Sequence, residues 1–186
     1  MQLEEKKVDR RILKTKKAIK DAFTDLIMKN EIDTISIAMI TEQANIGRKT
    51  FYLHYYDKYD LMDQIIAEYL EELGLRCNQN KIKRLGFEAS TLEWFTFLDE
   101  NFSLFARLFQ SKAATSFRNQ FLVFVSEQLR KKEKLAASKV SLAFKLQFLS
   151  YAVTGIIEEY ITKDYRHKKQ EVAKQLSIIV KQNLTL

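Results

Sequence analysis

The residues best suited to chemistry lie in one short segment, IGRKTFYLHYYDKYDL, which spans residues 46–61. This segment holds six aromatic side chains when His54 is counted, and three cations, which are Arg48, Lys49 and Lys58. A hydrophobic core would accept the rings but exclude the cations, whereas a solvated surface would accept the cations but exclude most of the rings. The mixture is typical of a surface that binds a polyanion, in which some rings anchor the segment and the cations and hydroxyls face outward.

Other reactive side chains do not form a recognisable site. The chain has two histidines, His54 and His167, and one cysteine, Cys77, which are too few for a metal site. Glu158 and Glu159 are adjacent on an expected helix, so they point in different directions and do not form a catalytic pair. The sequence also lacks a glycine-rich phosphate loop and a nucleophile with a base at a readable spacing. We therefore expect no catalytic residue, no metal and no cofactor, and a protein that is not an enzyme.

Composition and charge narrow the class of protein further. The 186 residues include no proline and only four glycines, which favours long helices with short connections over a β-rich fold. The net charge is +7, and the span from Lys6 to Lys20 holds eight cations and a single acid, Asp9. Such clustering favours a polyanionic partner. The single cysteine fits a reducing compartment, and no apolar run approaches the about 20 residues that span a bilayer, so we expect a cytoplasmic protein with no membrane partner.

The apolar periodicity predicts an all-α fold, with a small N-terminal domain and a larger, aromatic-rich helical bundle. We place the N-terminal domain at residues 1–57 and the C-terminal domain at residues 58–186. The expected helices cover residues 10–29, 37–43, 48–54 and about 58–74, and then lie near residues 86–99, 101–110, 112–131, 138–163 and 168–183.

The two short helices and their connection have the pattern of a helix-turn-helix. Ser36 is expected to cap the first short helix, and Asn45 can adopt the left-handed conformation of a tight turn. Phe51 is expected to anchor the second short helix to the core, and Asp57 to cap the long helix that follows. In a helix-turn-helix the second helix enters a major groove of DNA and presents its N-terminal residues to base edges.

The segment TISIAMITEQANIGRKTFYLHYYDKYDL, residues 34–61, resembles the DNA-binding domain of TetR-family transcriptional regulators. The residues that match the family pattern in register are Thr50, Phe51, Tyr52, His54, Tyr55, Lys58 and Leu61. The sequence departs from the pattern at Asn45, where a turn glycine is usual, at Thr41, where alanine is usual, and at Tyr55, where phenylalanine is usual. The resemblance covers about residues 10–72, and it implies an all-α homodimer whose C-terminal domain senses a ligand or a partner.

The resemblance and the segment's chemistry together give a set of expected DNA contacts. Arg48 and Lys49 are expected at base edges or phosphates, Thr50 and Tyr52 at phosphates, and His54 at the backbone or a base. Lys58 begins the next helix, where its charge and free backbone N–H groups suit a phosphate. The full set of expected DNA-binding residues is Ser36, Arg48, Lys49, Thr50, Tyr52, His54 and Lys58.

The C-terminal domain supports two interpretations. Its aromatic residues either fill a core or line a ligand pocket, for which the candidates are Trp94, Phe97, Phe105, Phe109, Phe121 and Tyr151. The last two long helices are expected to form the homodimer interface through Phe148, Gly155, Ile156, Leu176 and Ile179.

These interpretations lead to two hypotheses about function. The first is a homodimeric, sequence-specific DNA-binding repressor that an effector in the C-terminal domain releases from its double-stranded DNA operator. The alternative is an activator or co-regulator controlled by a protein partner that docks on that domain. A closed cavity of several hundred cubic ångströms would favour a small-molecule effector, and a filled bundle with an exposed apolar patch would favour a protein partner.

Overall fold

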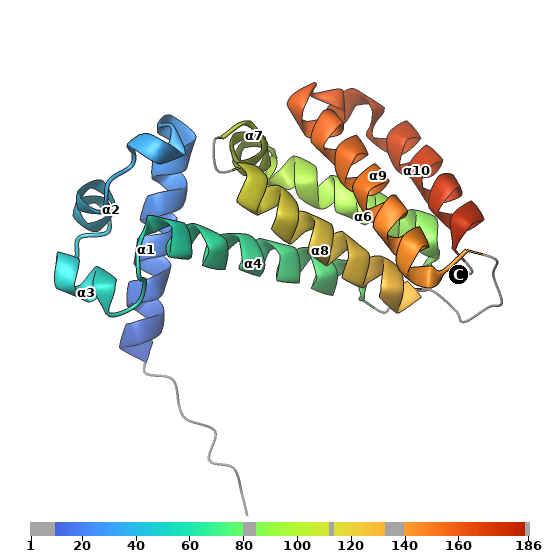
Figure 1. The fold of residues 1–186 in the computed structure, drawn as a ribbon. Helices are drawn as coiled ribbons and strands as arrows, with labels where there is room; N and C mark the ends of the chain where they lie inside the picture. The colour runs from blue at the N-terminus through green and yellow to red at the C-terminus, as the bar shows by residue number, and fades with distance from the viewer. Residues whose placement is uncertain (1–9, 80–84, 112–113, 133–139, 185–186) are drawn as a thin grey trace, which may run out of the picture. The chain divides into compact units, whose positions relative to one another are not determined.

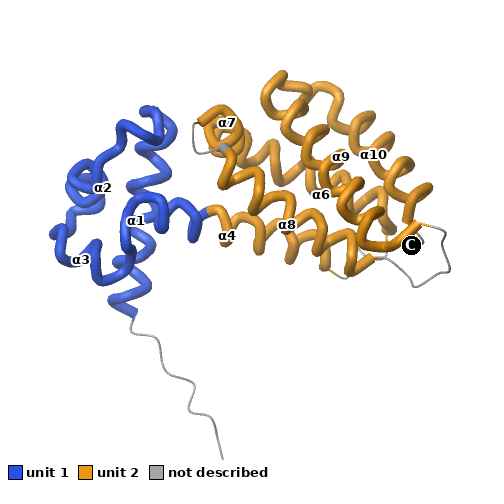
Figure 2. Tube along the Cα trace, in the orientation of Figure 1, with its two compact units in different colours: residues 1–65 blue, residues 66–186 orange. Residues whose placement is uncertain are grey.

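The fold is that of a computed structural model, which describes residues 10–79, 85–111, 114–132 and 140–184. Every regular element in these residues is a helix, which confirms the expected all-α class (Figure 1). The chain divides into two compact units, residues 1–65 (unit 1) and 66–186 (unit 2), shown in Figure 2. The division falls inside a continuous helix, after Ile65, rather than before Lys58 where we expected it.

Unit 1 contains the small helical domain. Its elements are α1 (Arg10–Lys29), the 3-10 helix η1 (Ile32–Thr34), α2 (Ile37–Gln43), α3 (Arg48–Tyr52) and the first turns of α4 (Lys58–Cys77). α1 buries a stripe of apolar side chains that runs from Ile19 to Ile27. α2 packs against both α1 and α3. The core also takes Leu61, Met62 and Ile65 from α4, all of which are buried. These three residues explain why the unit extends past the expected boundary.

Unit 2 is a bundle whose helix bounds lie within a few residues of the expected ones. Its elements after α4 are α6 (Phe87–Glu100), α7 (Phe102–Gln110), α8 (Ala114–Lys132), α9 (Leu142–Thr162), the 3-10 helix η2 (Tyr165–Lys168) and α10 (Lys169–Asn183). α6 packs against α10, α8 packs against α9, and α7 contacts both α8 and α9. These contacts bury many of the periodic apolar positions that predicted the helices, whereas Phe148 of α9 and Ile179 of α10 stay exposed.

Aromatic rings fill the centre of unit 2. Phe97, Phe105, Phe109, Phe117 and Phe121 are all buried and contact one another in edge-to-face or tilted arrangements. The closest pair in this chain of contacts, Phe109 and Phe117, has ring centroids 4.7 Å apart. Such pairs add stability beyond the area that they bury. This part of unit 2 is therefore a packed core.

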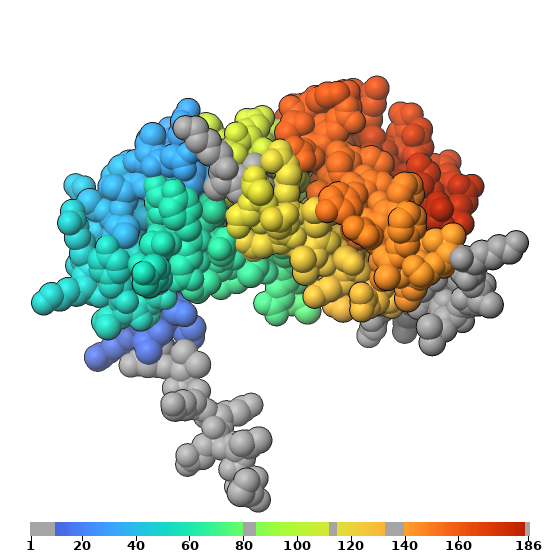
Figure 3. All heavy atoms as spheres, in the orientation of Figure 1, coloured from blue at the N-terminus to red at the C-terminus, as the bar shows by residue number. Residues whose placement is uncertain are grey.

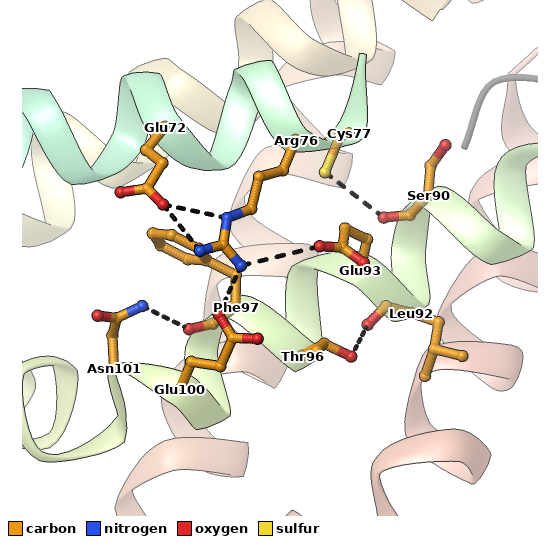
Figure 4. A network of polar contacts seen from close by, with 10 residues as sticks. All are labelled: Glu72, Arg76, Cys77, Ser90, Leu92, Glu93, Thr96, Phe97, Glu100 and Asn101. Carbon is orange, nitrogen blue, oxygen red and sulfur yellow. Dashed lines mark hydrogen bonds and ion pairs between the residues drawn. The ribbon is translucent and has the colours of Figure 1, made fainter. Parts of the chain in front are cut away.

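A polar network centred on Arg76 joins the end of α4 to α6 (Figure 4). The Arg76 guanidinium donates to Glu72 and Glu100 and lies 4.0 Å from the Glu93 carboxylate. It also stands 4.9 Å from the centroid of the buried Phe97 ring. The hydrogen bond to Glu100, followed by that to Glu72, raises the pKa of Arg76. Arg76 thus partly offsets the negative charge of three neighbouring carboxylates, and its guanidinium covers a core ring of unit 2.

Candidate DNA-binding surface

The α2–turn–α3 segment has the geometry that the sequence predicted for a helix-turn-helix. Ser36 caps α2, because its Oγ accepts a hydrogen bond of 3.2 Å from the Met39 N–H. Asn45 lies in the left-handed region with φ 52°, and Ile46 N–H closes the turn by donating to the Thr41 carbonyl at 3.0 Å. The hydroxyl of Thr41 donates to backbone carbonyls of α2, so a threonine fits where the family usually has alanine.

α3 presents one face to the core and another to solvent. Phe51 is fully buried, and its ring contacts those of Tyr52 and Tyr55. Arg48 and Lys49 are exposed, and neither side chain has a hydrogen-bond or ion-pair partner among the described residues. Two cations that are free in this sense are available to an anionic partner.

Two exposed apolar residues near the end of α3 were absent from the expected set. Leu53 is 79% exposed, and Tyr56 is 85% exposed. The Leu53 N–H donates to the Lys49 carbonyl at 3.2 Å, so these two side chains follow one another along one side of the helix. Helical spacing from Lys49 would have indicated Leu53, but an apolar residue carries no chemical signal by itself. We call the exposed set Arg48, Lys49, Tyr52 and Leu53 the reading surface.

Thr50 and His54 are less accessible than the reading surface. Both are half-buried, and the His54 ring stands 6.4 Å from that of Tyr55. Their expected DNA contacts remain proposals.

Lys58 does not present a free cation, which differs from our expectation. Its Nζ donates to three backbone carbonyls of the α1–α2 connection, those of Ile32 at 3.1 Å, Asp33 at 2.7 Å and Ile35 at 2.8 Å. An ammonium has three N–H donors, and all three are used here. A phosphate contact by this side chain would require these bonds to break. The cap of α4 is as expected, because Asp57 accepts from the N–H groups of Tyr59 and Asp60.

The basic cluster of the N-terminus is only partly described. Lys6, Lys7 and the single acid of the cluster, Asp9, lie outside the described residues. On α1, Arg10 and Lys14 are exposed at the first turns, whereas Lys17 is paired with Asp21 at 2.7 Å. The positive charge that α1 adds therefore lies mainly at its N-terminal end.

Most of the residues expected to line a ligand pocket form a packed core instead. Phe97, Phe105, Phe109 and Phe121 are buried against one another, and Tyr151 is exposed on α9. Of the six candidates, Trp94 alone lines the small apolar cavity found in unit 2, together with residues such as Cys77 and Leu176. This cavity has a volume of about 50 Å³, whereas pockets for small organic ligands usually measure roughly 300 to 1,000 Å³. Burial also raises the pKa of the Cys77 thiol to about 12.

The expected interface residues separate into two groups. Phe148 of α9 is 59% exposed and Ile179 of α10 is 45% exposed, and Gly155 of α9 is also exposed. Figure 3 shows α9, in orange, at the surface of unit 2. Ile156 is half-buried. Leu176 is only 4% exposed and lines the small cavity, so its assignment to the interface was wrong.

Comparisons with known proteins agree with this geometry. A family model of the TetR type, described as a transcriptional regulator C-terminal region, matches residues 87–182, which is just over half of the chain. The chain belongs to the TetR family of transcriptional regulators. Members of the TetR family bind DNA and typically form dimers.

Two sequence relatives of this TetR-family chain are regulators with a helix-turn-helix. The HTH-type transcriptional regulator YxbF of Bacillus subtilis (strain 168) is 37% identical over 82 residues, which cover 41% of this chain and 22% of the relative. The HTH-type dhaKLM operon transcriptional activator DhaS of Lactococcus lactis subsp. lactis (strain IL1403) is 32% identical over 95 residues, which cover 51% of this chain and 49% of the relative. The matches thus span about half or less of each relative's length.

Solved structures show the same TetR-family fold over nearly the whole chain. The TetR transcriptional regulator from Streptococcus agalactiae 2603V has a TM-score of 0.70 at 24% identity, covering 92% of this chain and 96% of that chain. The dihydroxyacetone kinase operon activator DhaS has a TM-score of 0.69 at 24% identity, covering 91% and 96%. Within the described residues, no helix has the length and apolar character needed to cross a membrane.

Proposed function

We propose that this TetR-family regulator binds a specific double-stranded DNA operator through the reading surface of α3. The observation that carries this proposal is the pair of exposed cations, Arg48 and Lys49, at the start of a helix whose other face is anchored by the buried Phe51. A helix held in this way can enter a major groove, where arginine and lysine read guanine and contact phosphates. Tyr52 adds a hydroxyl suited to a phosphate oxygen, and Arg10 and Lys14 of α1 add positive charge.

The proposal includes a homodimer, formed through the exposed apolar residues of α9 and α10. Phe144, Phe148 and Tyr151 of α9 and Ile178 and Ile179 of α10 are large apolar side chains that this chain leaves in solvent. A Cβ added at Gly155 would meet nothing within 4 Å among the described atoms of this chain, so the chain itself does not require glycine there. Two helices from each copy would make a four-helix bundle that buries these residues, with Gly155 at a close crossing. Two reading surfaces could then meet successive major grooves, about 34–36 Å apart.

The packing of unit 2 favours control of DNA binding by a protein partner over control by a small effector. A filled aromatic core and a cavity of about 50 Å³ leave little room for an organic ligand. The relative DhaS is an operon activator, so activation as well as repression is a candidate role for this chain. We therefore favour an activator or co-regulator controlled by a docking protein, acting in the cytoplasm, over the effector-released repressor.

Selection of bound duplexes from a random DNA pool tests the proposed function. We expect a two-fold symmetric consensus, because a homodimer presents the same surface twice. Affinity for this consensus should fall steeply with salt, each neutralised phosphate contributing about −0.9 to the slope of log K against log salt. Enrichment of no sequence, together with a flat salt response, would contradict the proposal.

Transcription from a promoter that carries the selected operator distinguishes the two modes of control. Purified protein alone should lower transcription if it is a repressor. If it is an activator controlled by a partner, the protein alone should raise transcription or leave it unchanged. Strong repression that a small molecule relieves would contradict the mode of control that we favour.

A further inference from the structure

One side chain closes the segment that contains both helices of the helix-turn-helix. This segment begins after η1 and Ile35, and it ends at Lys58, the first residue of α4. The Lys58 ammonium bridges these two points by donating to the carbonyls of Ile32, Asp33 and Ile35. The bonds join residues 23 to 26 positions apart, so they are tertiary contacts and not part of a local turn.

The bridge is fixed on both sides. The side chains of Ile32 and Ile35 are buried in the core of unit 1, and the next residue, Ser36, caps α2. On the other side, Asp57 caps α4, and Leu61 follows in the buried stripe of α4. Tyr59 adds a hydroxyl contact of 3.5 Å to the Asp33 carboxylate. We call Lys58 and its three carbonyls the Lys58 clamp.

We propose that Lys58 is a positioning residue, which holds α2 and α3 at the angle needed to read DNA, rather than a residue that contacts DNA. The clamp uses every donor of the ammonium, and it fixes the start of α2 relative to the helix that follows α3. This inference rests on the proposed function. The clamp should also protect α2 in the absence of DNA, so an experiment can contradict this inference without contradicting the proposed function.

The Lys58→Arg and Lys58→Met variants separate the clamp from a phosphate contact. Arginine keeps the charge and binds phosphate well, but its planar fork cannot direct three donors at three converging carbonyls. The measurement is the ratio of affinities for the selected operator and for a shuffled duplex. Loss of a phosphate contact, or partial unfolding, lowers both affinities and leaves this ratio unchanged. We expect both variants to lower the ratio about tenfold or more, since specific binding needs α3 correctly placed. An unchanged ratio in Lys58→Arg would overturn the inference.

A chemical pair separates hydrogen bonding from charge at the same position. In a Lys58→Cys variant, the thiolate displaces bromide from 2-bromoethylamine and forms a thioether that restores an ammonium at lysine length. The trimethylammonium analogue of the reagent restores the charge without any N–H donor. Cys77 is buried with its thiol pKa raised to about 12, so it stays unmodified, and treated wild-type protein is the control. We expect the ammonium to restore the ratio and the trimethylammonium to leave it low. Equal recovery with both reagents would overturn the inference.

Hydrogen exchange tests the clamp without DNA. Amides of α2 should exchange faster in Lys58→Arg than in wild type, while amides of α9 in unit 2 should be unchanged. If wild-type protein selects no DNA sequence, the proposed function fails, whereas exchange still reports on the clamp. If the amides of α2 exchange as slowly in Lys58→Arg and Lys58→Met as in wild type, Lys58 does not hold the segment.

Discussion

Arg48 is the residue whose change should alter sequence preference most directly. Its exposed guanidinium has no partner among the described residues, and it lies at the N-terminal end of α3. We expect Arg48→Ala to lose about 1 to 3 kcal/mol at one base pair of each half-site and to relax preference there. Affinities across single-base operator variants measure this effect. Arg130→Ala, at an exposed arginine in the last turn of α8, is the matched control. An unchanged ranking of operator variants in Arg48→Ala would make Arg48 a phosphate contact.

Leu53 should recognise the methyl group of a thymine. It is a largely exposed apolar side chain within the reading surface, and the thymine methyl is the apolar group of the major groove. Replacing one thymine of each half-site by deoxyuridine removes this methyl and keeps base pairing. We expect wild-type affinity to fall by about 0.8 kcal/mol per lost contact, and the loss to disappear in Leu53→Ala. Leu75→Ala, at an exposed leucine elsewhere on the chain, should keep the full effect. Equal sensitivity to deoxyuridine in both variants would exclude the contact.

At the scale of elements, the α2–α3 turn depends on one left-handed residue. Asn45 has φ 52°, a conformation that costs an alanine roughly 1 kcal/mol or more and costs glycine nothing. We expect Asn45→Ala to lower the free energy of unfolding by about 1 kcal/mol and Asn45→Gly to change it little. Urea unfolding followed by circular dichroism measures both. Asn119→Ala, at an exposed position inside α8, should instead be neutral or stabilising, because alanine favours a helix. Equal effects of alanine at the two sites would remove the turn's special role.

The long helices were predictable from sequence because their apolar residues recur at helical spacing and the pattern is clearly interrupted between them. Ser36 and Asn45 mark the ends of α2 through local chemistry, which needs no knowledge of distant residues. The hydrogen bonds of Lys58 were not predictable in this way, because the carbonyls of Ile32, Asp33 and Ile35 are brought to it only by the tertiary fold. From sequence alone, a lysine at a helix N-terminus can equally well bind a phosphate or donate to backbone carbonyls. The positions of those carbonyls in the fold decide between the two.

The choices that the sequence left open in the C-terminal domain, and the misplacement of Leu176, have a related cause. α10 has apolar residues on two sides, and periodicity does not say which side its own chain covers; Leu176 is buried and Ile179 is exposed. Phenylalanines at helical spacing are equally compatible with a cavity wall and with a filled core. The volume that remains between helices decides the matter, and it depends on side chains from several elements at once.

At the scale of the whole molecule, dimerisation should be separable from folding. Phe148→Glu and Ile179→Glu together place charges on exposed positions, so we expect a folded monomer with greatly weakened operator affinity. The driving force lost is the burial of apolar surface between copies. Sedimentation and circular dichroism measure assembly and folding. Val123→Glu, at an exposed valine of α8, is the matched control and should leave the dimer intact. A double variant that remains dimeric with full affinity would place the interface elsewhere.

The division of the chain inside α4 affects the order in which the two units can fold during synthesis on the ribosome. Unit 1 needs Leu61, Met62 and Ile65 for its core, so a nascent chain can close this core only after Ile65 has emerged. The remaining turns of the same helix then carry Tyr69 and Leu73, whose partners in unit 2 have not yet been synthesised. These apolar side chains stay exposed until the later helices follow, as expected for a protein whose N-terminal part folds first. A ribosome-bound chain that stops at the end of α4 should therefore have a folded DNA-binding unit followed by an apolar segment that a chaperone can bind.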